Sequence, residues 1–369
     1  MVGKQRGTEL FLKIAHISFL MRNLLFKGLK ILSPSRALID RDPTLVSIGY
    51  SHYCEKARFA LDLSPLKESY REERHTPFFH LPYTLDLRKL PRHTPWLVTE
   101  DLLGTSAGEV SHSRLASKEL TGVPKLIVHL ADRGPVVVGE GSRGVLRFLA
   151  HQYPKECGFL YPKDIREAVI EMEDRLDSLL GQAASDWSFG NVFLPIDDCN
   201  KLSIDYFIRL STEGAPPLEQ FLFRILAKSS VVGVMTKANK ISIERTVRAK
   251  QVILNEFKHL DEVFSKNKDK NENLLSMGAF RCKKYLMGTN HPTAADIALS
   301  ALSIPLLMPD AAHHIFGSLE EIENFVVTNG NGDSQTAGLQ RIIELTKQLR
   351  ETQTGQMVLD IYRVHRHKQ

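Results

Sequence analysis

The segment from Thr44 to Leu66 constrains the fold most, because it contains the patterns of a strand, a polar turn and a helix in direct succession. Residues 45–48 form a short apolar run, which is typical of a buried strand. A helical pattern begins at Cys54 and ends before Pro65, since proline disfavours the helical conformation in the residue that precedes it. Ser51 and Cys54 are therefore expected where the strand gives way to the helix.

This turn is a candidate chemical site. The unpaired N–H groups and the positive dipole end of a helix start favour an anion, and a thiol placed there ionises more readily. We expect Ser51, Cys54 and Tyr53 to be the candidate catalytic residues, with Tyr50 as a rival hydroxyl donor. A cysteine one turn into an amphipathic helix is, however, more often buried and inert than reactive.

Length and charge limit the class of protein. A chain of 369 residues is long enough for two domains, and its four cysteines show neither a disulfide framework nor a CxxC pair, which suits a reducing compartment such as the cytoplasm. Residues 1–40 hold seven Lys and Arg against two acids, and this alone accounts for the net charge of +5. The remainder is neutral, so the charge balance does not indicate a nucleic-acid partner.

Residues 1–43 form a basic N-terminal extension with an amphipathic pattern over residues 9–33. Its longest charge-free run, residues 14–21, is too short to span a bilayer. Three alternatives stay open. The extension is a mitochondrial or plastid presequence, a helix that lies on a membrane surface, or an extra helix packed on the folded body.

The first domain is predicted over residues 44–155, as an α/β unit. Residues 69–73 are a second strand candidate, and the β-branched runs at 122–128 and 135–138 predict a hairpin. Ser142 then stands at the start of a helix, a second position that favours an anion. Four prolines within residues 75–121 predict an irregular inserted loop.

Histidines raise the alternative of a metal-dependent isomerase or hydrolase. His75, His80 and His93 lie in the predicted loop, and His52 lies in the turn. Their spacing, without a nearby cysteine, does not fit a zinc site, so we predict packed histidines and no metal.

The second domain is predicted over residues 160–365, as an all-helical unit. Apolar residues recur at helical spacing over residues 165–180, 221–235 and 241–264, with solvated loops expected at 266–272 and 328–336. Thr293 and Asp296 are typical of a helix N-cap, so we interpret Asp296 as structural. Some aromatic residues of this half could contact a substrate, although aromatic residues at helical spacing more often belong to a core. They are Trp187, Phe189, Phe193, Phe221 and Phe223.

Four motifs in order resemble the glutathione transferase superfamily: residues 51–61, Val123 to Leu126, residues 142–149, and residues 285–298. The resemblance implies a thioredoxin-like N-terminal domain followed by an all-helical bundle of the glutathione transferase type. It places Ser51 where related proteins carry a nucleophilic cysteine or a thiolate-supporting serine, and Cys54 in the second, usually buried, cysteine position.

The resemblance also implies a binding site for glutathione. Val123 would present its backbone to the cysteinyl group, with Pro124 in the cis form, and Ser142 would bind the γ-glutamyl carboxylate at its helix start. Three departures stand beside it. Gly141 occupies the position where the superfamily usually has an acid, while Glu140 lies one place early. His52 replaces the common proline in the turn, and the long loop over residues 75–121 replaces a short connection.

The implied function is a glutathione-dependent transferase for detoxification, with glutathione as co-substrate and a small hydrophobic electrophile as its partner. The superfamily resemblance further implies a homodimer. Two alternatives stay open. One is a non-catalytic glutathione-transferase-like binding module, and the other is a thiol-disulfide oxidoreductase that depends on Cys54.

Overall fold

The computed structural model describes residues 41–77, 79–87, 89–92, 122–194, 201–226, 232–275, 285–329 and 336–366. Nearly all of the predicted N-terminal extension lies outside these residues. His93 and most of the predicted insertion also lie outside them.

The first half of the chain builds one four-stranded sheet in the order β2-β1-β3-β4. β1 (Thr44–Ile48) pairs in parallel with β2 (Arg71–His75) and antiparallel with β3 (Lys125–Leu130), which forms a hairpin with β4 (Gly134–Glu140). The predicted strands are confirmed, although β2 covers residues 71–75 and not the predicted 69–73.

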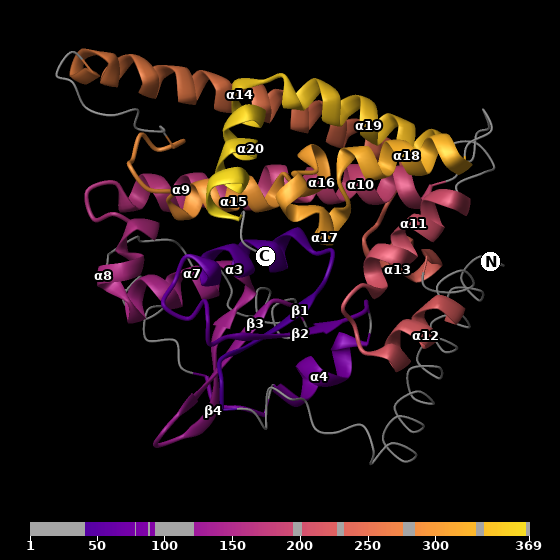
Figure 1. The fold of residues 1–369 in the computed structure, drawn as a ribbon, viewed down its shortest axis with the longest axis horizontal. Helices are drawn as coiled ribbons and strands as arrows, with labels where there is room; N and C mark the ends of the chain where they lie inside the picture. The colour runs from indigo at the N-terminus through magenta and orange to yellow at the C-terminus, as the bar shows by residue number, and fades with distance from the viewer. Residues whose placement is uncertain are drawn as a thin grey trace, which may run out of the picture.

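Helices cover both faces of the sheet (Figure 1). α3 (His52–Asp62) and α7 (Gly141–Gln152) pack together on the face toward the helical half, and α4 (His80–Leu87) lies on the opposite face. Strand residues alternate between two clusters of buried side chains, as the pleat requires: Leu45 and Leu126 belong to the large core, and Val46 and Ile127 belong to the smaller one, which Leu87 joins.

α4 corrects the prediction that residues 75–121 are irregular throughout. The prolines were taken to break every element there, but Pro82 is the third residue of α4. Proline is tolerated in the first turn of a helix, because those N–H groups have no intrahelical partner.

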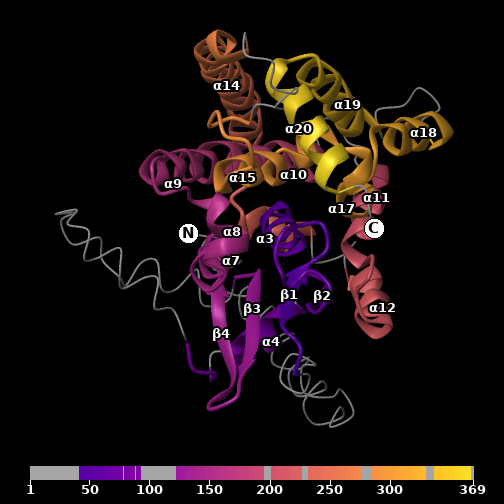
Figure 2. The same cartoon turned by 60° about the vertical axis from the view of Figure 1, so that its left-hand side comes forward.

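The second half of the described chain is helical, with α15 at its centre (Figures 1 and 2). Every residue of α15 (Ala294–Leu302) is buried, and the helix packs against α3 and α9. The remaining helical elements are α8 (Pro154–Cys157), η1 (Gly158–Leu160), α9 (Arg166–Arg175), η2 (Leu176–Gly181), α10 (Gln182–Phe193), α11 (Lys201–Thr212), α12 (Pro217–Leu226), α13 (Val232–Ala238), α14 (Ile243–Leu275), α16 (Ile304–Leu307), η4 (Asp310–Ala312), α17 (His313–Phe316), α18 (Leu319–Asn329), α19 (Ala337–Arg350) and α20 (Gln353–His365).

Two details of the helical half differ from the sequence pattern. The predicted loop at residues 266–272 is helical, because α14 continues to Leu275. Conversely, the pattern over residues 221–235 divides between α12 and α13. Within the described residues, no helix is both long enough and apolar enough to cross a membrane.

Strand order and helix positions together confirm the predicted fold class. A small mixed sheet with helices on both faces forms a thioredoxin-like domain, and an all-helical domain follows it. α3 is the element that joins them, since it contacts both α7 of the first domain and α15 of the second.

Candidate functional site

Strand register places the predicted site residues at one edge of the sheet. Val46 pairs with Lys125, and Lys125 pairs with Glu140. The turn after β1, the bend before β3 and the start of α7 after β4 therefore meet at the same edge. Ser51, Val123 with Pro124, and Ser142 belong to these three segments.

Ser51 is the N-cap of α3. Its extended backbone conformation and its hydroxyl oxygen, which accepts a hydrogen bond from the N–H of Cys54 at 3.3 Å, stabilise the first turn. The Ser51 hydroxyl also forms a hydrogen bond with the thiol of Cys54. Ser51 is half-buried and lies in the predicted turn.

Cys54 lies directly beneath this cap and is fully buried. Its sulfur accepts a hydrogen bond from the N–H of Ile48 at 3.5 Å. Burial raises the pKa of the Cys54 thiol, and the nearby guanidinium of Arg58 offsets only part of that rise. The neutral thiol is therefore the favoured form of Cys54.

The aromatic residues of the turn face the helical domain. The Tyr53 hydroxyl donates to the backbone oxygen of Asp177 at 3.2 Å, and burial raises the pKa of Tyr53. Burial likewise lowers the pKa of His52 to about 4, and its Nε2 lies 3.5 Å from the hydroxyl of Ser185. Both side chains thus contact η2 or α10.

The Val123-Pro124 peptide bond is cis, as the resemblance implies. The N–H of Gly141 donates to the oxygen of Pro124 at 2.9 Å, which ties this bend to the start of α7. Gly141 has φ of 71°, a left-handed conformation that glycine adopts most readily. The glycine at this position therefore follows from the backbone geometry.

Glu140 and Ser142 flank that glycine. Glu140 is the N-cap residue of α7, but its carboxylate is held by Lys125 at 3.0 Å and Arg92 at 3.3 Å. Ser142 is buried in the first turn of α7. Of these two predicted ligand-binding residues, Ser142 has the helix-start position that favours an anion.

Sequence reasoning missed the buried charges of α3. The apolar pattern predicted an ordinary amphipathic helix, yet Glu55, Lys56 and Arg58 are all buried. The Lys56 ammonium lies 2.8 Å from Glu173 and 2.9 Å from Asp177, and the Arg143 guanidinium lies 3.1 Å from the same aspartate. A network of ion pairs thus joins α3, α7 and the helical domain beside the turn.

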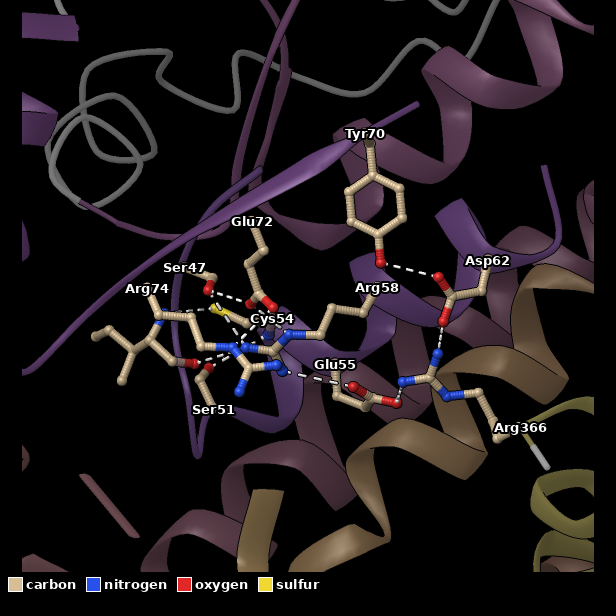
Figure 3. Close-up of polar contacts among 11 residues, drawn as sticks. Ser47, Ser51, Cys54, Glu55, Arg58, Asp62, Tyr70, Glu72, Arg74 and Arg366 are labelled. Atoms are coloured by element: carbon tan, nitrogen blue, oxygen red, sulfur yellow. Dashed lines mark hydrogen bonds and ion pairs between the residues drawn. The ribbon is translucent and has the colours of Figure 1, made fainter. Parts of the chain in front are cut away.

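A second network lies on the β2 side of α3 (Figure 3). Arg58 donates to Glu72 at 2.5 Å and to the backbone oxygen of Ile48 at 3.1 Å, and Ser47 donates to Glu72. Burial alone would raise the pKa of Glu72, but Arg58 and Arg74 outweigh it and lower that pKa to about 2. A fixed cation therefore lies directly behind the turn.

The aromatic residues named from the sequence separate into distinct environments. Phe189 and Phe193 stack at 5.5 Å, and the Tyr50 ring meets Phe189 edge-on at 6.1 Å, with Phe207 completing the group. The other three lie elsewhere: Trp187 beneath Lys250, Phe223 in the core, and Phe221 exposed on α12. Phe207 was not singled out from the sequence, because it becomes a neighbour of Tyr50 only through packing.

The histidines have structural partners. His75 is buried between Glu219 at 2.9 Å and Glu73 at 3.4 Å, and its ring stacks on Tyr83. Among the residues that the structure describes, no group of three or more His, Cys, Asp or Glu side chains could hold a metal ion.

Comparison with known proteins finds solved structures that are similar to this chain. No family model matches the chain, and no curated protein matches it. A glutathione transferase family member from Pseudomonas fluorescens with two glutathione bound shares 13% identity at a TM-score of 0.37, over 86% of this chain and 92% of that one.

Two fungal structures are similar to a comparable extent. A glutathione S-transferase of Ceriporiopsis subvermispora in complex with glutathione has 12% identity and a TM-score of 0.41, over 84% of this chain and 97% of that one. A glutathione transferase from Phanerochaete chrysosporium has 15% identity and a TM-score of 0.42, over 84% and 96%. All three bear the name of the superfamily that the sequence motifs resemble.

Proposed function

We propose that this protein binds glutathione as a thiolate and transfers it to a small hydrophobic electrophile. One observation carries the proposal. The Ser51 hydroxyl caps α3 through its oxygen and lies at the same sheet edge as the Val123-Pro124 bend, where its O–H group can donate to a bound sulfur.

The chemistry of the site supports a thiolate. A sulfur at the start of α3 would receive a hydrogen bond from Ser51 and the positive potential of the helix dipole. Together these are worth roughly 1.5–4 kcal/mol, which would lower a thiol pKa by about one to three. The thiolate, and not the thiol, is the nucleophile.

The peptide arms of glutathione fit the neighbouring segments. The extended backbone before β3 could pair with the cysteinyl unit of the tripeptide, and the start of α7 at Ser142 favours its γ-glutamyl carboxylate. Tyr50 lies in the turn and is half-buried, and its ring contacts half-buried Phe189, so the two rings form an aromatic surface beside the turn. An apolar electrophile is the class of second substrate that such a surface accepts.

The test compares Ser51→Ala with wild type in two measurements. Calorimetry gives the affinity for glutathione, and thiolate absorbance as a function of pH gives the pKa of the bound thiol. We expect wild type to bind glutathione with a depressed thiol pKa, and Ser51→Ala to raise that pKa by about one or more. Conjugation to a chloronitrobenzene-type electrophile should slow in parallel.

Ser69→Ala is the matched control, because Ser69 is exposed and its hydroxyl bonds only the local backbone oxygen of Leu66. Absence of glutathione binding in wild type would refute the proposal. Binding with an unshifted thiol pKa would instead support a non-catalytic binding module.

A Cys54-dependent oxidoreductase is the second chemical alternative. Its sulfur would have to exchange with a disulfide, yet Cys54 is fully buried and its thiol pKa is raised. These two properties favour Ser51 over Cys54 as the residue that contacts the reacting sulfur.

A further inference from the structure

The chain after α20 returns to α3 through one buried arginine. The side chain of Arg366 is 1% exposed, and its Nη2 lies 2.6 Å from Oε1 of Glu55. The same guanidinium pairs with Asp62 and lies over the ring of Phe59, 5.5 Å from its centroid (Figure 3). Burying a guanidinium is costly unless carboxylates compensate it, so this contact depends on the charges of α3.

Glu55 is the carboxylate that matters for the site. It lies in the first turn of α3, where its N–H donates to the backbone oxygen of Ser51 at 2.9 Å. A negative charge at this point opposes any second anion at the helix start. Arg58 compensates the negative charge of Glu55 only in part, because their closest atoms are 3.4 Å apart and Arg58 also forms an ion pair with Glu72.

We propose that Arg366 is a positioning residue for the site at Ser51, acting through Glu55. By pairing with Glu55, it keeps the start of α3 electropositive enough to hold a thiolate, in the sense of the function proposed above. Other charges near this turn are Glu72 and Arg74 of β2, Lys56 of α3, Asp177 of η2 and Arg143 of α7. The titratable side chains of Tyr70, His314 and Tyr362 also interact with Glu55. None of them is changed in the test.

The experiment measures the potential at Ser51 without glutathione. Ser51→Cys, made together with Cys54→Ala so that no Cys-X-X-Cys pair forms, places a single thiol at the N-cap, and the pH dependence of its alkylation by iodoacetamide, followed by mass spectrometry of that peptide, gives its pKa. Buried Cys157 serves as the internal report of folding, because it reacts only if the structure opens. Because this measurement uses no glutathione, absence of glutathione binding would refute the proposed function without deciding this inference.

Removing Arg366 should raise the pKa of the introduced thiol. In the Ser51→Cys, Cys54→Ala background, Arg366→Ala is expected to lower the thiolate fraction at neutral pH about tenfold, since Glu55 loses a direct cation. Arg363→Ala is the matched control, because Arg363 is exposed and pairs with Asp360 outside the network. It should leave the pKa unchanged.

A double variant separates electrostatics from loss of packing. Adding Glu55→Gln to Arg366→Ala removes the uncompensated charge and should return the thiol pKa to that of the parent. Glu55→Gln alone should lower the pKa of the introduced thiol below its value in the parent variant. If Arg366→Ala unfolds the protein and exposes Cys157, the Glu55→Gln variant alone tests the inference. An unchanged pKa in these variants, or a shift that Glu55→Gln does not reverse, would overturn the inference.

Discussion

Lys56 Nζ lies 2.8 Å from Oε1 of Glu173, and both side chains are fully buried between the two domains. Asp177 accepts from the same ammonium at 2.9 Å. Lys56→Met would leave buried Glu173 without this cation, so the free energy of unfolding should fall by about 3–5 kcal/mol in urea denaturation.

The control for this prediction is an exposed pair. Lys347 lies 2.6 Å from Glu323, and its side chain is 59% exposed. Lys347→Met should change stability by less than about 1 kcal/mol. Equal effects of the two substitutions would show that the buried pair does not join the domains.

His75 should make stability depend on alkaline pH. Burial alone would lower its pKa, but Glu219 and Glu73 outweigh burial and raise the pKa to about 9. A raised pKa means that the stabilisation is complete below the unfolded value near 6.5 and is lost as pH rises through 9. The loss should amount to roughly 3 kcal/mol in denaturation curves between pH 6 and pH 10.

Glu219→Gln tests this assignment, because it removes the main partner of His75 while keeping a side chain of similar size. The alkaline loss of stability should shrink in that variant. A pH dependence as steep as that of wild type would assign the effect to another group.

Cys54 should be dispensable for glutathione binding. Because it is buried and its thiol pKa is raised, it should react with iodoacetamide far more slowly in the native protein than in urea. Cys54→Ala should keep the affinity for glutathione within about threefold, a change of less than ~1 kcal/mol. Thiol-disulfide exchange activity that is lost in Cys54→Ala and kept in Ser51→Ala would instead indicate the redox alternative.

Asp296 should be a folding residue. Its carboxylate accepts from the N–H of Leu286 at 2.7 Å, the N–H of Thr293 at 2.8 Å and the Thr293 hydroxyl at 2.7 Å. Asp296→Asn replaces one accepting carboxylate oxygen by an NH₂ group, which cannot accept these hydrogen bonds. The substitution should destabilise the protein by roughly 2 kcal/mol or more. Asp310→Asn is the control, because Asp310 is exposed and its closest cation, Arg350, is 4.0 Å away.

The fold, and the segments that meet at the candidate site, could be predicted because they depend on local patterns. The change from strand to helix at Ser51, the Val123-Pro124 bend and the cap at Thr293 each need only neighbouring residues. The buried charges of α3 could not be predicted in this way. Lys56 finds its partners more than a hundred residues later, and Glu55 finds Arg366 another two hundred residues further on.

Gly141 has a conformational reason that its sequence position does not reveal. The superfamily usually has an acid at this position, and here a glycine stands there. The backbone there is left-handed, and an added Cβ would meet no atom within 4 Å, so conformation and not space selects glycine.

The pairing of Arg366 with Glu55 also bears on synthesis of the protein. Translation delivers α3 early, but its carboxylates receive this guanidinium only after residue 366 has left the ribosome. Until then, the nascent first domain carries a carboxyl group whose buried partner is still missing. Docking of the two halves is therefore completed only after translation of α20.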